Sequence, residues 1–376
     1  MLAWAILCKY AFHSYLRPER FIKLRTRDYG YGEKYFAGAG RVPKRMRASR
    51  VPERIQNSYL PSLQVLRAIA ALAVVCYHAC LFVQRESGQV LFGGWYHLGE
   101  LGVDFFFVLS GFIIAHVHGH ELGLPNCAPR YLKRRFFRIY PLLFVLTSLR
   151  LLAELPQWVK GIKAPDWERL FSSYLLLPQS DGAMPIISAA WTLQHEALFY
   201  GLFLMALLLG RRVGALLMAG WILLVVVVGV FGVGLHGLPR LLCDAHNVEF
   251  MFGVLVCESL HQRVMVPSRL LVWGILLAGM MFGVACYEPR LGMDQKLITR
   301  CMLGAGFAAL IWLLAGHEMK HGAMPWPAWL RWIGDASYSI YLAHSVVLLM
   351  VVAILTRFLH GSLAYAYGVA GASVIA

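Results

Sequence analysis

Beyond residue 60 the chain is a series of long apolar runs, separated from one another by short polar or basic segments. A helix that crosses a lipid bilayer needs about 20 consecutive, mostly apolar residues. The pattern therefore predicts an all-α polytopic membrane protein with about ten transmembrane helices. The predicted spans are 60–83, 99–118, 139–154, 191–210, 213–235, 245–260, 270–287, 298–315, 335–356 and 362–376, of which the third and the last are short.

Two segments depart from this pattern. Residues 169–190 are amphipathic, which favours a half-inserted or re-entrant segment. The start of the chain is polar, and residues 9–59 contain 13 Lys and Arg. We expect a basic cytoplasmic N-terminal tail over 1–59, followed by one integral-membrane domain over 60–376.

The composition agrees with a membrane protein. Hydrophobic residues make up 59% of the chain, charged residues 15%, and the mean hydropathy is +0.60. A soluble domain carries about 25% charged residues. These values exclude an intrinsically disordered chain and argue against a soluble enzyme. The eight cysteines are scattered and form no CxxC pair, so they indicate no disulfide framework.

The formal net charge of +15 comes from 35 Lys and Arg against 20 Asp and Glu. In a soluble protein this excess would suggest nucleic acid, but here it fits cytoplasmic loops and anionic lipid head groups. With the N-terminus inside, the tail and the predicted inner loops carry 24 Lys and Arg, and the outer segments carry eight. The positive-inside rule therefore predicts cytoplasmic N- and C-termini. We expect membrane lipids, and no nucleic acid, as partners.

Arg67 and His78 are ionisable residues within the first predicted span, where charge is costly and commonly functional. Eleven positions separate them, which brings both side chains to one helix face, about 16 Å apart along the axis. Such a face lines a protein interior or a wet cavity. The alternative is structural: an Arg that extends to the inner head groups, and a His that bonds a neighbouring span.

Arg135 and Arg138 lie in a basic, aromatic-rich segment, RYLKRRFFRIYP at 130–141, which we expect to be a loop that leads into the third span. On one helical turn both guanidiniums would hold a phosphate. The alternative is a plain positive-inside determinant. Glu196 lies about a turn and a half into the fourth span and needs a partner there. Its expected roles are to orient an imidazolium, to accept a proton or to bind an acceptor hydroxyl, with a polar contact between helices as the alternative.

The remaining histidines and cysteines do not indicate a metal site. Residues two apart on a helix are separated by about 200°, so His78 points away from Cys76 and Cys80. His116 and His120 share a helix face, which is typical of a wetted cluster at the membrane interface. We therefore expect no metal.

Two smaller features concern helix packing. Gly111 lies inside an aromatic run and predicts close approach of a second helix. Tyr338, Tyr341 and His344 recur three residues apart and form one polar stripe on an otherwise apolar helix.

Taken together, six segments resemble the membrane acyltransferase family that O-acetylates bacterial exopolysaccharide, lipopolysaccharide O-antigen, Nod factors and related glycans. They are LRAIAALAVVCYH, LGVDFFFVLSGFII, RRFFRIYP, WTLQHEALFYGLF, NVEFMFGVL and GDASYSIYLAH, they follow the order of the family, and they cover roughly residues 60–350. The resemblance implies a domain of roughly ten helices in the bacterial inner membrane. It also implies an acyl-CoA donor from the cytoplasm, usually acetyl-CoA, and an acceptor hydroxyl on a glycan or lipid-linked oligosaccharide.

By the same resemblance, His78 is the catalytic residue, Arg67 supports it, and Arg135 and Arg138 bind the coenzyme. An imidazole with an ordinary pKa of about 6.5 suits general-base work at neutral pH. Direct attack by the sugar and an acyl-histidine intermediate both stay open. Arg67 lies three turns from His78, which favours a role in holding the coenzyme or in organising the pore.

Glu196 is the further catalytic candidate. The chain departs from the family pattern in its long basic tail and in His195, which precedes this carboxylate. That histidine either tunes Glu196 or has no role.

Two other classes of protein stay open. A membrane transporter or flippase of a glycan or small anion would also place polar groups in a membrane cavity, although the sequence shows no internal repeat. A non-enzymatic scaffold would use the basic tail but would leave the Arg67–His78 face unexplained. Protection of the Arg135–Arg138 segment by coenzyme would distinguish the enzyme from both.

Overall fold

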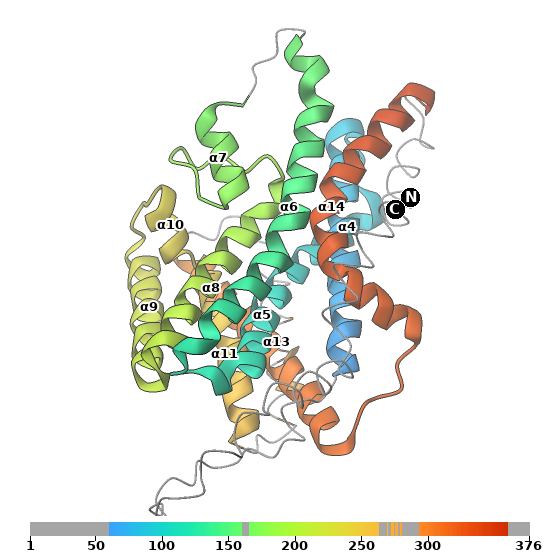
Figure 1. Cartoon of the computed structure of the whole chain (residues 1–376). Coiled ribbons are helices and arrows are strands. Elements are labelled where there is room, and N and C mark those ends of the chain that lie inside the picture. The colour runs from blue at the N-terminus through green and yellow to red at the C-terminus, as the bar shows by residue number, and fades with distance from the viewer. Residues whose placement is uncertain are drawn as a thin grey trace, which may run out of the picture. The chain divides into compact units, whose positions relative to one another are not determined.

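The computed structural model describes residues 60–159, 165–262 and 293–359, with isolated positions between 269 and 279. Over these residues the chain is helical and forms no strand (Figure 1). The α-helices are α4 (Pro61–Ser87), α5 (Leu101–His118), α6 (Ala128–Val159), α7 (Trp167–Leu175), α8 (Trp191–Leu209), α9 (Arg211–Phe231), α10 (Gly237–Cys243), α11 (Asn247–His261), α13 (Met293–His321) and α14 (Ala328–Leu359). The 3-10 helices are η1 (Leu91–Glu100), η2 (Gly119–Glu121), η3 (Pro125–Cys127) and η4 (Ser188–Ala190).

Seven helical segments in the described part of the chain are long and apolar enough to cross a membrane. They are Pro61–Arg85, Leu91–Glu121, Pro125–Leu155, Ser188–Leu209, Arg211–Phe231, Leu297–His321 and Ala328–Val351. These segments confirm the all-α polytopic membrane architecture. The count of ten spans and the cytoplasmic placement of both termini stay predictions.

The other three predicted spans have different outcomes. The span at 245–260 corresponds to α11, a helix of 15 residues. The span at 270–287 falls where only isolated positions are described, and the span at 362–376 lies outside the described residues. The amphipathic segment 169–190 contains the end of α7, and its half-inserted state stays a prediction.

The expected loop at 130–141 is wrong, because this segment belongs to α6. The basic residues of this segment predict a position outside the membrane, with the span beginning near Pro141. In the structure Arg135 and Arg138 turn inward to partners on other helices, so the helix continues through them. Pro141 lacks the N–H for an intrahelical bond, a loss that membrane helices tolerate.

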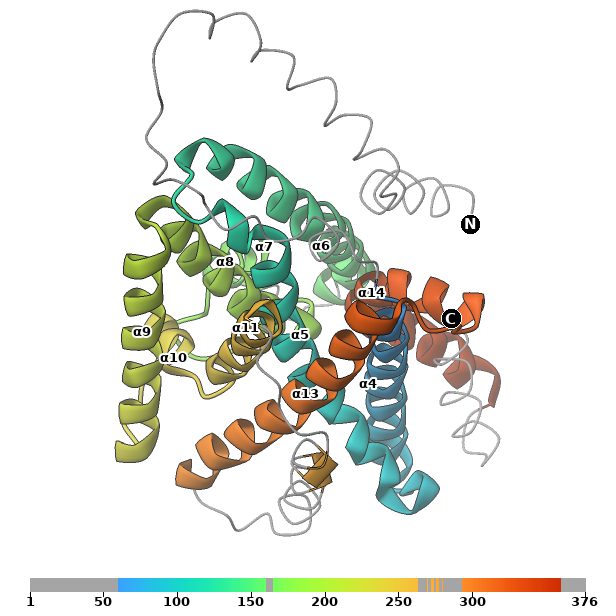
Figure 2. The same cartoon turned by 90° about the horizontal axis from the view of Figure 1, so that it is seen from below.

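Two helix pairs pack closely within the described bundle. α4 runs beside α14, and α5 runs beside α11 (Figures 1 and 2). Glycines allow both approaches: a Cβ on Gly334 of α14 would lie 1.9 Å from the carbonyl oxygen of Gln64, and a Cβ on Gly111 of α5 would lie 1.9 Å from that of Phe250. Gly253 of α11 meets an α5 carbonyl oxygen equally closely. The predicted close packing at Gly111 is confirmed.

The two ends of the bundle are defined here by α8. At one end, named the His118 end, α5 finishes, α6 starts and α8 turns into α9, and the N–H of Gly123 donates to the carbonyl oxygen of Leu207 at 2.8 Å. At the opposite end, named the Trp191 end, α8 begins beside α10.

Candidate active site

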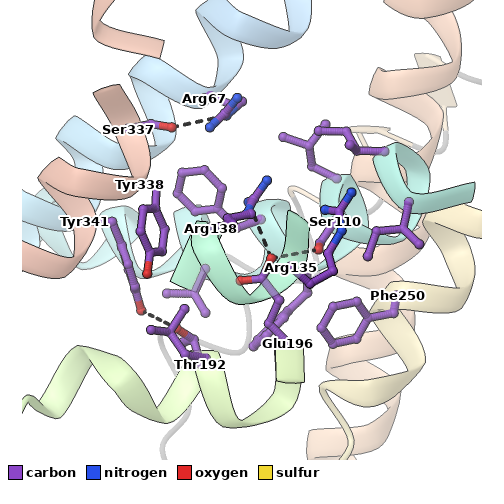
Figure 3. A pocket seen from close by; sticks show the side chains of 17 residues that line it. Arg67, Ser110, Arg135, Arg138, Thr192, Glu196, Phe250, Ser337, Tyr338 and Tyr341 are labelled. Atoms are coloured by element: carbon purple, nitrogen blue, oxygen red, sulfur yellow. Dashed lines mark hydrogen bonds and ion pairs between the residues drawn. The ribbon is translucent and has the colours of Figure 1, made fainter. Parts of the chain in front are cut away.

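A cavity of about 60 Å³ lies between α4, α5, α6, α8, α11 and α14 (Figure 3). Its polar lining consists of Arg67, Ser110, Arg135, Arg138, Thr192, Glu196, Ser337, Tyr338 and Tyr341, and the rest of its wall is aliphatic or phenylalanine. Four of the five site residues predicted from the sequence therefore meet at one place, and only His78 does not. Three guanidiniums face one carboxylate, which leaves an excess of two positive charges in a largely apolar wall.

Glu196 is held at a single carboxylate oxygen. Arg138 on α6 approaches its Oε1 at 3.4 Å, Ser110 Oγ on α5 donates to the same atom at 3.3 Å, and the Tyr200 hydroxyl donates to it from the next turn of α8. All three contacts use Oε1, so Oε2 makes none of them. The carboxylate thus connects α5, α6 and α8 and balances the positive charge of one of the three arginines.

Arg135 is fixed at the His118 end of the bundle. Its Nη2 donates to His118 Nε2 at 2.8 Å, and its guanidinium lies 5.2 Å from the centre of the Tyr200 ring. An arginine only donates, so His118 Nε2 accepts, and the imidazole proton sits on Nδ1, which donates to Glu121 Oε2 at 2.6 Å. A neutral histidine therefore links the guanidinium to a carboxylate.

The Nε groups of Arg135 and Arg138 are buried and have no hydrogen-bond partner among the described residues. A buried donor without a partner costs about 1–3 kcal/mol. Neither guanidinium is thus fully satisfied by the described residues. The Nε of Arg67, in contrast, donates to Ser337 Oγ at 3.1 Å, and its Nη1 donates to Gln64 Oε1 at 3.0 Å.

His78 lies outside the cavity lining, farther along the α4–α14 contact. Its Nδ1 is 3.0 Å from the carbonyl oxygen of Val74, and its ring centre is 4.7 Å from that of His344 on α14. His344 Nδ1 is likewise bonded to a helix carbonyl oxygen, that of Tyr341. A carbonyl only accepts, so both Nδ1 atoms carry the proton and both Nε2 atoms keep a basic lone pair.

Tyr341 connects this histidine pair with the cavity. Its ring lies 5.8 Å from the His344 ring, and its hydroxyl lies 3.0 Å from Thr192 Oγ1 inside the cavity. His344 was not among the site residues predicted from the sequence, although the polar stripe on its helix contained it. Ser337, Tyr341 and His344 recur at intervals of four and three residues, so the periodicity of α14 was the signal for this face.

Arg300 and His195 have other partners. Arg300 on α13 forms an ion pair with buried Asp104 on α5, which accounts for a charge inside the membrane by a contact between helices. His195 does not contact Glu196, because successive side chains on a helix diverge by about 100°. Its Nδ1 instead donates to Asn247 Oδ1 at 2.9 Å.

One group among the described residues has the composition of a metal site. His116 on α5 and Cys257 and His261 on α11 bring their ligand atoms within 4.8 Å of one another. However, His261 Nδ1 already donates to the carbonyl oxygen of Cys257 at 2.7 Å, as a histidine at a helix end commonly does. The helix therefore accounts for the cysteine–histidine contact without an ion.

Comparisons with known proteins identify the family of this chain. The family model described as "Acyltransferase domain" matches residues 60–376. The "Exopolysaccharide production protein ExoZ" of Rhizobium meliloti (strain 1021) is 26% identical over 69% of this chain and 80% of its own length. The "Acyltransferase MdmB" of Streptomyces mycarofaciens is 27% identical over 84% of each chain.

A third relative is the "Putative peptidoglycan O-acetyltransferase YrhL" of Bacillus subtilis (strain 168), which is 26% identical over 78% of this chain and 49% of its own length. No solved structure matches the chain.

Proposed function

This chain belongs to the acyltransferase family and is an acyltransferase. We propose that it transfers an acyl group, acetyl in the simplest case, from acyl-CoA to a hydroxyl of a cell-envelope glycan. The acceptor is an exopolysaccharide, an O-antigen or a related lipid-linked oligosaccharide, and the enzyme works in the bacterial inner membrane. The names of two relatives, one for exopolysaccharide production and one for peptidoglycan O-acetylation, support a glycan acceptor. Membership of an enzyme family disfavours a transporter.

The observation that carries the proposal is the cavity with three arginines and one carboxylate. Coenzyme A presents several phosphate charges, and a guanidinium fork matches a phosphate oxygen pair. Arg135 and Arg138 have buried Nε donors that a phosphate oxygen would satisfy. The predicted orientation places the His118 end, where Arg135 is fixed, on the cytoplasmic side, from which coenzyme arrives.

Arg67 holds the donor farther along its path. It lies in the cavity and contacts Ser337 of α14, while His78, about 16 Å along α4, contacts His344 of the same helix. The contact region between α4 and α14 therefore leads from the arginines to the histidines. In this proposal the pantetheine arm follows that region and brings the thioester to His78.

His78 acts as the general base. Its Nε2 takes the proton of the sugar hydroxyl as the hydroxyl oxygen attacks the thioester carbonyl carbon. The C–O bond forms, the C–S bond breaks, and the proton passes from the imidazolium to the departing coenzyme thiolate. A route through an acyl-imidazole would use the same nitrogen as nucleophile, so both routes require Nε2 to be free.

Glu196 acts as a positioning residue in this proposal. Its only described ionic partner is Arg138, and its hydroxyl donors are Ser110 and Tyr200. None of these contacts reaches His78. Glu196 thus places the Arg138 guanidinium that binds the coenzyme, and this role replaces the three expected from the sequence: orienting an imidazolium, accepting a proton or binding an acceptor hydroxyl.

Radiolabelled acetyl-CoA tests the proposal. Membranes containing the wild-type protein are expected to transfer label to alkali-labile esters of envelope polysaccharide, and His78→Ala membranes with equal protein content are not. Label in the polysaccharide with both proteins would exclude His78 as the base. No label with the wild-type protein would exclude acetyl transfer from acetyl-CoA to these glycans.

A further inference from the structure

A second cavity, of about 110 Å³, lies at the Trp191 end of the bundle. It is formed by the loop that follows α7, the first turns of α8, and α10 with the residue after it. Its lining includes Gln179, Trp191, Gln194, Arg240 and Asp244. No feature of the proposed donor site uses these side chains.

The first turns of α8 separate this cavity from the donor cavity. Trp191 and Gln194 line the second cavity, whereas Thr192 and Glu196 line the first, as the helical periodicity requires. Phe107 of α5 completes the partition: it lines the first cavity, and its ring packs at 6.1 Å against that of Trp191. The two cavities therefore lie back to back.

Trp191 provides a fixed aromatic wall. Edge-to-face contacts hold its indole against His195, with ring centres 5.6 Å apart, and against His246, with ring centres 5.2 Å apart. His195 is fixed in turn by Asn247. The histidine that departs from the family pattern thus supports this wall.

The amide side chains of the cavity are oriented by the backbone. Gln194 Nε2 donates to the carbonyl oxygen of Leu177 at 2.8 Å, and Gln179 Nε2 donates to that of Met184 at 3.1 Å. Because both NH₂ groups are engaged, each side chain has a fixed Oε1 that accepts hydrogen bonds.

Two charged groups complete the lining. Arg240 is exposed, and no ion pair of this guanidinium occurs among the described residues. Asp244 Oδ1 accepts from the N–H and the Nδ1 of His246 at 3.0 and 2.6 Å. Burial opposes ionisation of Asp244, but the contacts with His246 outweigh it and hold the pKa of this carboxyl well below its usual range. The cavity thus offers a cation, an anion and two amide oxygens beside the indole ring of Trp191.

This set of groups matches a sugar ring. A pyranose has an apolar C–H face that packs on an indole, and a rim of hydroxyls that both donate and accept hydrogen bonds. Amide oxygens and the carboxylate accept from such hydroxyls, and the guanidinium donates to them. A purely apolar ligand would leave these polar groups unpaired in the complex, which is costly.

We propose that this second cavity is a recognition subsite for a sugar unit of the acceptor glycan, an inference that rests on the proposed transfer to glycans. The partition by Phe107 and α8 means that the bound sugar is a neighbour of the acylated unit. The subsite therefore selects the glycan, while the hydroxyl that reacts belongs to another sugar of the same chain.

Purified full-length protein in lipid nanodiscs tests the inference. The acceptor probe is envelope polysaccharide from the source strain, freed of esters by mild alkali, and the donor is radiolabelled acetyl-CoA. For Trp191→Ala and Arg240→Ala we expect the acceptor KM to rise about tenfold, the effect of losing about 1.4 kcal/mol of binding. The acetyl-CoA Kd should stay within about twofold of the wild-type value.

Two variants serve as controls. Trp191→Phe keeps the aromatic wall and should keep most of the acceptor affinity. Trp167→Ala removes a tryptophan of α7 that is 75% exposed and does not line the cavity, and it should change neither constant.

The outcomes separate this inference from the proposed function. A wild-type acceptor KM in both Trp191→Ala and Arg240→Ala would overturn the subsite while leaving transfer to glycans in place. A Trp191→Ala protein that also loses acetyl-CoA binding would overturn it as well, because the side chain would then support the whole fold. Absence of transfer by the wild-type protein would contradict the proposed function itself.

Discussion

The imidazole rings of His78 on α4 and His344 on α14 lie 4.7 Å apart, and each ring bonds a carbonyl oxygen of its own helix through Nδ1. Both Nε2 atoms are thereby left as the basic nitrogens of the pair. Two histidines in this state on facing helices provide a base and a neighbour that keeps it in place.

His344 is therefore predicted to be a positioning residue for His78. His344→Ala should lower kcat about tenfold, since loss of one supporting contact is worth about 1–1.5 kcal/mol. The acetyl-CoA Kd should not change. His344→Gln keeps a donor for the Tyr341 carbonyl oxygen and should recover part of kcat. Equal losses in both variants, or a weaker Kd, would argue for a general packing role instead.

Arg135 is predicted to bind a phosphate group of the donor. Arg135→Ala should weaken acetyl-CoA binding about tenfold or more, because hydrogen bonds to charged groups contribute about 1.5–3 kcal/mol. Acetyl-pantetheine lacks the nucleotide phosphates, so its use as donor should be affected little. Arg130→Ala, which removes an exposed arginine of the same helix, is the matched control. Equal weakening of both donors by Arg135→Ala would place its role away from the nucleotide.

Glu196→Gln is predicted to have opposite effects on donor binding and on turnover. The variant removes the one carboxylate of the donor cavity and raises its net positive charge, so acetyl-CoA should bind about two- to tenfold more tightly. Turnover should fall, because Arg138 loses its ionic partner. Tyr200→Phe, which removes a neutral donor from the same oxygen, should not tighten binding. If Glu196→Gln abolished turnover with no change in Kd, Glu196 would have the acid–base role instead.

Gly111→Ala is predicted to destabilise the helix bundle strongly. Its Cβ would lie 1.9 Å from the carbonyl oxygen of Phe250, so α5 and α11 would have to separate. The expected cost is about 2 kcal/mol or more. Gly201→Ala on α8 is the control, since nothing lies within 4 Å of its added Cβ. Thermal unfolding in detergent should show a lower Tm for Gly111→Ala only, and equal Tm values for the two variants would contradict the close packing.

The sequence alone predicts those features that depend on a single helix, such as where the helix lies and which residues share one of its faces. Apolar runs located the seven spans that the described residues contain, and helical arithmetic put Arg67 and His78 on one face. Both residues indeed contact the same neighbouring helix, α14, through Ser337 and His344. The spacing of Arg135 and Arg138 likewise anticipated one helical turn.

Partners on other helices could not be predicted in this way. The pairing of Arg138 with Glu196 depends on how α6 packs against α8, and the sequence does not encode that distance locally. The charges of the basic segment before Pro141 favour an aqueous surrounding and so predict a loop, whereas the fold supplies inward partners for Arg135 and Arg138. The position of His78 outside the donor cavity also follows only from the packing of α4 on α14.

Acetate in the surface and secreted glycans of the source strain, measured by proton NMR, tests the central claim most directly. A strain that lacks this protein should lose an O-acetyl signal. The wild-type gene should restore that signal, and His78→Ala, present in the membrane at an equal level, should not. Restoration by His78→Ala to the wild-type level would contradict the account.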